Sequence, residues 1–299
     1  MIVASHISKY FGSFAALDDF SCSISDGCIY GLVGSNGAGK STFLRLISGV
    51  YSSEKGEIHI DGEPVFDNMG MKQRIVFVPD ELYFLPRCNM QRMAKLYASM
   101  YENFSYEKFY RLATTFDLDI KKKINTFSKG MKRQAATVLA LSCNADYIMF
   151  DETFDGLDPV MRNLLKRILY ADICERNSTI IISSHSLREL EDTCDQLAML
   201  HSGRIIFESD VMNLKTSLFK IQVAFSKDYD KDTFKAIDML HYQKSGSVAT
   251  MIVRGNRDEV AALIKAMNPL LFEIIPLSLE EVFIYEMDAL GYECNEVLL

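Results

Sequence analysis

The sequence contains no CxxC pair, and its seven cysteines are scattered between Cys22 and Cys294. An odd, unpatterned set of this kind predicts reduced thiols in a reducing compartment rather than a disulfide framework. The chain also lacks any apolar run near the roughly 18 residues that span a bilayer, so a membrane-spanning part would have to come from another chain. Residues 1–13 show no basic region followed by an apolar stretch, and we therefore expect no signal peptide.

Positive charge is also scarce. The 32 Lys and Arg residues are outnumbered by 40 Asp and Glu residues, which leaves a net charge of -8. Because nucleic-acid binding normally needs a basic face, we expect no nucleic-acid partner. Low-complexity tracts and internal repeats are absent too, and the 48% hydrophobic and 24% charged residues are typical of a folded chain with a buried core.

Short apolar runs alternate with helical patterns over residues 1–210, which predicts an α/β fold with a parallel sheet. Residues 82–125 are rich in Met, Tyr and Phe and predict an inserted helical subdomain. Ser186 and Glu189 have the spacing of a helix-capping box. Four runs are expected to be buried strands: Ile29–Val33, Ile75–Val78, Tyr147–Phe150 and Thr179–Ser183.

The pattern changes after about residue 212 and predicts a small α+β domain over 213–299. This region contains no catalytic motif, and we expect it to be an accessory domain. Its expected elements are strands near 217–225, 248–254 and 270–276, helices near 230–240 and 257–267, and a closing helix from Ser278.

Residues 34–41 read Gly-Ser-Asn-Gly-Ala-Gly-Lys-Ser and match the phosphate-binding motif GxxxxGK(S/T) in full. They follow an expected strand and open an expected helix at 41–48, the context that this motif needs. Glycines let backbone N–H groups curl around phosphate oxygens, and the helix N-terminus adds partial positive charge. Lys40 is expected to reach the β- and γ-phosphates of a nucleoside triphosphate, and Ser41 to ligate Mg²⁺. The other expected nucleotide contacts are Gly34, Ser35, Asn36, Gly37, Ala38, Gly39 and Thr42.

Two carboxylates, Asp151 and Glu152, emerge at the end of the apolar run that starts at Tyr147. Ligands in open α/β sheets bind at the carboxyl ends of the strands. We expect Asp151 to hold Mg²⁺ and Glu152 to orient and help deprotonate an attacking water. His185 ends another expected strand at the same sheet edge, where it could contact the γ-phosphate or be purely structural.

Residues 127–131, Phe-Ser-Lys-Gly-Met, narrow the class of nucleotide-binding protein. They resemble the signature sequence of ABC ATPases, commonly Leu-Ser-Gly-Gly-Gln, and match it at Ser128 and Gly130. The Lys-Gly-Met form is similar to that of ABC-2-type exporter ATPases. Arg133 and Gln134 stand in reverse of the family's usual order. The resemblance implies that Ser128 and Gly130 contact the γ-phosphate of ATP.

Other positions agree with this resemblance. Phe11 resembles the aromatic residue that stacks on adenine, with Tyr10 as its rival. Asp158 resembles the D-loop aspartate that communicates across the dimer, and His185 resembles the family's switch histidine. Asp80 stands where the family normally has glutamine, and a carboxylate there could bind Mg²⁺ through water.

The resemblance implies a P-loop NTPase of ABC type over residues 1–212, with an antiparallel β subdomain and a helical subdomain at about 82–145. ATP and Mg²⁺ would bind between two chains of a head-to-tail homodimer, although a heterodimer remains open. Hydrolysis would power an exporter through a separate transmembrane permease, which residues 82–125 would contact. The chain would then lie in the cytoplasm, attached peripherally to the membrane through this partner.

The sequence lacks the features that are typical of the alternative functions. A translation-associated ABC protein would usually carry two P-loops, and a DNA-repair ABC ATPase would need a coiled-coil or zinc insertion. A P-loop kinase or switch GTPase would not need the segment around Ser128. The alternative that stays open is a solitary regulatory ABC ATPase that is not coupled to transport.

Overall fold

The computed structural model describes residues 1–289. The chain folds as two compact units, Met1–Glu208 and Ser209–Leu299. The division therefore falls a few residues before the expected boundary at 212/213.

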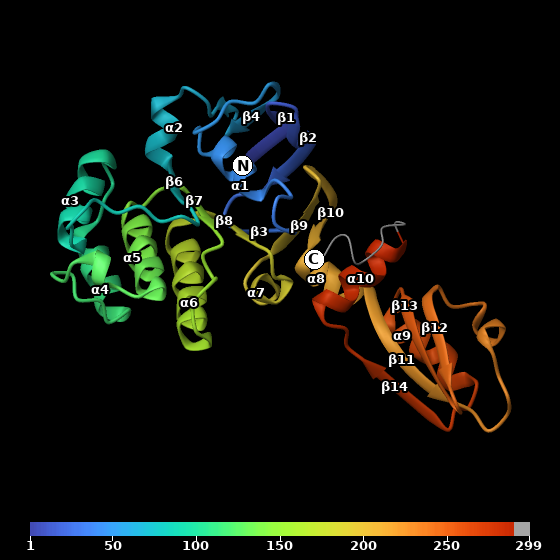
Figure 1. Cartoon of the computed structure of the whole chain (residues 1–299). Coiled ribbons are helices and arrows are strands. Elements are labelled where there is room, and N and C mark those ends of the chain that lie inside the picture. The colour runs from blue at the N-terminus through green and yellow to red at the C-terminus, as the bar shows by residue number, and fades with distance from the viewer. Residues whose placement is uncertain (290–299) are drawn as a thin grey trace. The chain divides into compact units, whose positions relative to one another are not determined.

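The first unit contains two sheets (Figure 1). The four-stranded antiparallel sheet has the order β2-β1-β4-β5, with bounds Phe14–Ile24, Ile2–Phe11, Lys55–Ile60 and Glu63–Pro64. The six-stranded sheet has the order β10-β9-β3-β8-β7-β6, with bounds Arg204–Asp210, Gln196–His201, Ile29–Val33, Thr179–Ser184, Tyr147–Asp151 and Ile75–Val78. Four of its five pairings, β9–β3, β3–β8, β8–β7 and β7–β6, are parallel, so the predicted parallel sheet is confirmed.

Strands β3 and β6 have the bounds that their apolar runs predicted. Every residue of β3 is buried, as expected for a parallel strand with both faces covered. Strands β7 and β8 each extend one residue further than predicted, because Asp151 still pairs with Ser183 and Ser184 still pairs with Val33 in the parallel register. The acidic end of β7 is therefore held in the sheet.

Seven helices accompany the strands among residues 1–208: α1 (Lys40–Ile47), α2 (Met69–Arg74), α3 (Met90–Met100), α4 (Tyr106–Thr115), α5 (Lys129–Ser142), α6 (Pro159–Arg176) and α7 (Leu187–Glu191), with a 3₁₀ turn at Ile124–Thr126. Helix α1 belongs to a core shared by both sheets, in which Phe43 packs on Phe20 at 4.2 Å between ring centroids. This packing fixes α1, and with it the loop that precedes it.

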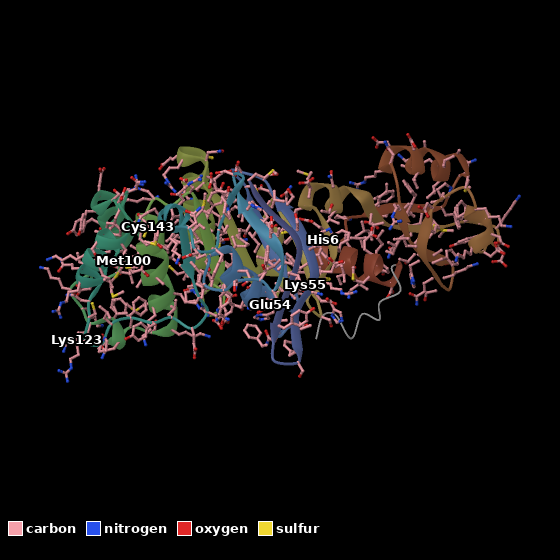
Figure 2. The ribbon with its side chains drawn as sticks, turned by 90° about the horizontal axis from the view of Figure 1, so that it is seen from above. His6, Glu54, Lys55, Met100, Lys123 and Cys143 are labelled. Atoms are coloured by element: carbon pink, nitrogen blue, oxygen red, sulfur yellow. The ribbon has the colours of Figure 1, made fainter. Side chains whose placement is uncertain are left out.

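Helices α3, α4 and α5 lie together beside the parallel sheet, as predicted for an inserted helical region (Figure 1). Ser105 begins α4 by accepting a hydrogen bond from the backbone N–H of Lys108, and Asn89 caps α3 in the same way. The basic run at Lys121–Lys123 is exposed, and the Lys123 side chain extends away from the ribbon (Figure 2).

The second unit contains an antiparallel sheet of order β12-β13-β11-β14. Its elements are α8 (Val211–Ser217), β11 (Leu218–Ala224), a 3₁₀ turn (Lys231–Phe234), β12 (Met239–Ser245), β13 (Val248–Arg254), α9 (Arg257–Ala266), β14 (Leu271–Ile275) and α10 (Leu279–Ala289). The helix expected at 230–240 is wrong. Only one 3₁₀ turn forms there, and β12 then pairs with β13 across a tight turn at Gly246, where φ is 61°.

The predicted capping box at Ser186 and Glu189 is also wrong. Ser186 precedes α7 but makes no side-chain capping bond. The carboxylate of Glu189 instead accepts a hydrogen bond from Ser184 Oγ at 2.7 Å and lies 3.1 Å from the Arg162 guanidinium. Tertiary partners therefore outcompete the local motif.

The cysteines of residues 1–289 form no disulfide with one another, and Cys294 lies outside the described residues. Among residues 1–289, no helix combines the length and the apolar character that crossing a membrane would require.

Candidate active site

The phosphate-binding loop between β3 and α1 depends on glycine at two tightly packed positions. Gly39 has φ of 110°, and a Cβ there would lie 2.6 Å from the Ala16 carbonyl oxygen. A Cβ on Gly34 would lie 2.4 Å from the carbonyl oxygen of Leu200. Real Cβ atoms do not approach backbone oxygens so closely, so both positions require glycine.

Lys40 is held at the first residue of α1 by the loop that precedes it. Its side chain is only 6% exposed, and Nζ donates to the carbonyl oxygens of Gly34 at 2.6 Å and Ser35 at 3.1 Å. The same nitrogen lies 3.4 Å from Oε1 of Glu152. The ammonium is thus fixed between the loop and the end of β7, where an anionic ligand would find it.

Asp151 offers one oxygen that has no partner. Its Oδ1 accepts a hydrogen bond from Ser183 Oγ at 2.6 Å, whereas Oδ2 is buried and finds no hydrogen-bond partner among the described residues. A buried carboxylate oxygen left in this state is costly, and a hard cation is the kind of ligand that satisfies it. The residue fits a Mg²⁺ ligand on these grounds.

Glu152 sits in a left-handed backbone conformation with φ of 50°. This conformation is strained for a non-glycine residue and often marks a functional position. Two contacts from Ser183 support it, since the Glu152 N–H lies 3.2 Å from the Ser183 carbonyl oxygen and 3.1 Å from Ser183 Oγ. The Glu152 carboxylate then meets the imidazole of His185, with Oε2 at 2.8 Å from Nδ1.

A cavity of about 230 Å³ brings most of the predicted nucleotide contacts together. Phe14, which the sequence analysis missed, lies in its wall and is 59% exposed. It pairs with Phe11 directly across the β1–β2 turn, so an aromatic next to such a short turn was its only sequence signal. The lining residues are Phe11, Phe14, Ala16, Asn36, Gly37, Gly39, Lys40, Ser41, Thr42, Asp80 and Glu152.

Phe11 and Phe14 offer different surfaces to a base. Phe11 packs edge-on against Tyr51 at 5.6 Å between centroids, and Lys9 Nζ lies 5.7 Å from its ring. Tyr10, the rival for the adenine position, is not part of the cavity wall. An exposed aromatic face is what stacking on adenine requires, and both phenylalanines supply one.

Ser128, Gly130 and Asp158 do not line this cavity. They lie together in a second hollow of about 590 Å³, formed by residues 128–131 and 156–158 with their neighbours. Ser128 begins α5, where its Oγ accepts from the Met131 N–H at 3.2 Å. Asp158 begins α6 in the same manner. The structure therefore divides these predicted site residues between two separate hollows of one chain.

Asp80 lines the cavity of about 230 Å³, but its carboxylate is already paired. Oδ1 accepts a hydrogen bond from Nη2 of Arg133, which also lies 3.6 Å from Asp155. Lys129 Nζ donates to Asp155 at 2.7 Å, and this hydrogen bond lowers the pKa of Asp155 below its usual value. Local sequence patterns do not reveal these pairs, because their partners lie up to 53 residues apart.

Comparison with known proteins links this site to one family. The family described as ABC transporter matches residues 17–155. The ABC transporter ATP-binding protein YtrB of Bacillus subtilis is 28% identical over 284 residues, which cover 95% of this chain and 97% of that protein. The bacitracin transport ATP-binding protein BcrA of Bacillus licheniformis is 32% identical over 220 residues, 72% of this chain and 71% of that protein. NatA of Bacillus subtilis, another ABC transporter ATP-binding protein, is 31% identical over 68% of this chain and 85% of its own length.

Solved structures show the same fold. The ATP-binding subunit of an ABC transporter superimposes with a TM-score of 0.66 at 25% identity, over 72% of this chain and 92% of that one. A dimeric post-hydrolysis cassette bound to ADP and Pi gives a TM-score of 0.62 at 21% identity, over 71% of this chain and 99% of that one. The predicted α/β cassette fold is confirmed by these likenesses.

Proposed function

This chain belongs to the ABC transporter family as an ATP-hydrolysing, ATP-binding subunit, and on that premise we propose that it works as a head-to-tail homodimer beneath a separate transmembrane permease. One observation supports the proposed dimer. The phosphate-binding loop and the signature residues Ser128 and Gly130 line two separate hollows of the same chain. A second copy of the chain, arranged head-to-tail with the first, would place the signature residues of each chain against the γ-phosphate of the ATP that the other chain binds.

Each residue of the nucleotide cavity has a role in the proposed reaction. Lys40 would exchange its loop carbonyl partners for β- and γ-phosphate oxygens, and the N-terminus of α1 would add its partial charge. Ser41 and Asp151 would hold Mg²⁺, which when bound neutralises charge on the phosphate oxygens. Phe11 and Phe14 would supply the surface on which adenine stacks.

Glu152 and His185 would handle the attacking water. The Glu152 carboxylate is 13% exposed and is held between Lys40 and His185, so its orientation is set before the reaction begins. It would orient the water and accept its proton, while His185 would keep the carboxylate aimed at the γ-phosphate. Ser128 with the N-terminus of α5 would bind the γ-phosphate from the partner chain.

The proposed direction of transport and the proposed location of the chain are based on its similarity to other ABC ATPases. The Lys-Gly-Met form of the signature resembles that of exporter ATPases, and BcrA is named for bacitracin transport. We therefore propose an exporter whose ATPase lies at the cytoplasmic face of the membrane. Helices α3 and α4 would contact the permease.

ATP-dependent dimer formation tests this proposal. The Glu152→Gln variant should bind ATP with Mg²⁺ without turnover and elute as a dimer in gel filtration, while Lys40→Ala should stay monomeric and bind ATP poorly. A Glu152→Gln chain that binds ATP yet remains monomeric would overturn the homodimer. A heterodimer would then be sought by adding a second ATPase chain from the same cell.

A different measurement distinguishes a transporter subunit from a solitary regulatory ATPase. Affinity purification of the chain from detergent-solubilised membranes should recover a polytopic membrane protein whose presence stimulates ATP hydrolysis. Recovery of the chain alone from the membrane-free fraction, with full hydrolysis, would favour the regulatory alternative.

A further inference from the structure

Arg133 is a buried cation near the start of helix α5. Its side chain is only 2% exposed. Its guanidinium pairs with Asp80, in the loop after β6, and lies 3.6 Å from Asp155, in the loop after β7. One side chain therefore joins α5 to the two loops that flank the nucleotide cavity.

The stability of the fold does not by itself explain this arginine. Nε and Nη1 of Arg133 are buried without an acceptor among the described residues, although a guanidinium carries five N–H donors. Buried charged donors left unpaired destabilise a protein, and an apolar side chain of similar size often packs better. Both carboxylates that meet Arg133 are partly exposed and could be hydrated without it. The residue is thus better explained by what it positions.

The two ends of this arrangement belong to different halves of the catalytic site. Asp80 lies in the wall of the nucleotide cavity with Ser41 and Glu152. Ser128 lies on the same helix as Arg133, at its N-terminal cap, and lines the second hollow. A helix transmits displacement along its axis as a rigid element, so a shift at Asp80 would move Ser128 through Arg133.

The charges around α5 are consistent with a role for Arg133 in positioning the helix relative to the two loops. A helix N-terminus favours acidic side chains, yet the first turns of α5 carry Lys129, Lys132 and Arg133 and contain no acidic residue. The compensating carboxylates, Asp80 and Asp155, come from the loops after β6 and β7. Electrostatic attraction therefore favours the packing of the α5 N-terminus against these two loops.

We propose that Arg133 is a positioning residue for hydrolysis. Through Asp80 and Asp155 it holds the loops beside the chain's own nucleotide in a fixed relation to the signature that this chain presents to its partner. Asp80 then acts mainly as the anchor of Arg133, and the pair is close to electrically neutral, like the glutamine usual at position 80. This inference rests on the proposed function, because it assumes that the signature acts on a second chain.

A double-mutant cycle tests the proposal with Arg133→Gln, Asp80→Asn and the double variant. We expect each single variant to lower kcat about tenfold, as loss of positioning does, and the double variant to be no slower than the worse single variant. The Kd of the Arg133→Gln variant for ATP, measured in EDTA, should change by less than about twofold, because Arg133 touches no residue of the phosphate-binding loop. Arg133→Lys should recover part of kcat.

Two further measurements separate positioning from general damage. Backbone amides of residues 80–81 and 153–157 should exchange hydrogen faster in Arg133→Gln than in the parent chain, a readout that does not require hydrolysis. Lys132→Gln removes the same charge from the neighbouring position and should leave kcat and exchange unchanged.

Three outcomes would overturn the proposal: multiplicative effects in the double variant, parallel loss of ATP affinity, or unchanged exchange in both loops. Failure of the proposed function looks different, because the Glu152→Gln chain would then bind ATP yet remain monomeric in gel filtration.

Discussion

The two half-sites of this chain are built in different ways. The phosphate-binding half is made from backbone, with glycines packed against the carbonyl oxygens of Ala16 and Leu200 and a lysine held by loop carbonyls. The signature half, around Ser128, depends on side-chain ion pairs with Asp80 and Asp155. Backbone geometry tolerates almost no substitution, whereas ion pairs can be rearranged.

This difference explains where the chain departs from its family. The loop at 34–41 matches the family motif at every position, but residues 127–134 and position 80 do not. A half-site that depends on charge can exchange one set of partners for another without losing its fold. Four substitutions, in order of decreasing expected effect, would break or sharpen this comparison.

Asp172→Asn should damage the helical half while leaving the phosphate-binding loop intact. Asp172 is buried on α6 and pairs with Lys108 of α4, and it also accepts from Ser178 Oγ at 2.7 Å. Removing the carboxylate leaves the lysine buried and unpaired, which we expect to lower the free energy of unfolding by about 3 kcal/mol in urea denaturation. Glu175→Gln, an exposed change of the same charge on the same helix, should cost less than about 0.5 kcal/mol.

The stabilisation by Asp172 should depend on pH. Burial would raise the pKa of Asp172, but the charge of Lys108 and the hydrogen bonds from Lys108, Arg176 and Ser178 lower it below its ordinary value. A lowered folded-state pKa means that the stabilisation is complete above the unfolded-state pKa of about 4, and that it disappears as the pH falls through the folded value. The parent and Asp172→Asn chains should therefore converge in stability under acid, and a constant difference down to low pH would contradict this assignment.

Gly39→Ala should disable the backbone half. Its new Cβ would meet the Ala16 carbonyl oxygen at 2.6 Å, so the loop must move, and we expect ATP affinity to fall at least about a hundredfold, close to 3 kcal/mol. Gly37→Ala is the matched control, because Gly37 also has positive φ but its Cβ would meet nothing within 4 Å. Equilibrium binding should show a loss of about tenfold or less for Gly37→Ala. Equal losses in the two variants would mean that strain, and not packing, governs the loop.

Ser128→Ala should separate capping from catalysis. The hydroxyl caps α5, and its loss should lower stability by about 1 kcal/mol. Ser105→Ala removes an equivalent cap from α4 and should cost about as much in thermal unfolding. Only Ser128→Ala should also slow ATP hydrolysis, by about tenfold or more, because only Ser128 would face the partner's nucleotide. Similar hydrolysis in the two variants would reduce Ser128 to a structural cap.

Lys129→Gln should have the smallest effect on stability. Its partner Asp155 is exposed enough that solvent screens the pair, so unfolding free energy should change by less than about 1 kcal/mol and the change should shrink in high salt. Because Lys129 lowers the pKa of Asp155, the small stabilisation exists above the ordinary aspartate pKa and is lost as the pH falls through the lowered value. A large, salt-independent loss would show that the signature half is as rigidly built as the loop.

Local physics explains why much of the fold could be predicted. Strands β3 and β6 are apolar runs within one sheet, and Gly34, Arg74 and Pro79 interrupt these runs where the strands begin or end. Ser105 and Ser128 cap their helices through contacts only three residues along the chain. Such features need no knowledge of distant segments.

The incorrect predictions concern features that depend on residues far apart in the chain. Residues 230–240 resemble a helix by themselves, but only a 3₁₀ turn forms at Lys231–Phe234, and from Met239 the chain pairs with β13 as β12. Glu189 has capping-box spacing, yet Ser184 and Arg162 bind it instead. Each outcome depends on a competition between local and distant partners, and only the tertiary structure reveals the winner.

The sequence by itself determined the phosphate-binding loop, the acidic end of β7 and the order of the family motifs, because glycine conformation and buried strands are encoded over a few residues. Only the tertiary structure decided that Phe14 joins the cavity wall, that Asp80 is held by Arg133, and that the signature lines a separate hollow from the loop. These depend on contacts between residues far apart in the chain, where charge and packing complementarity choose among partners that local pattern leaves equivalent.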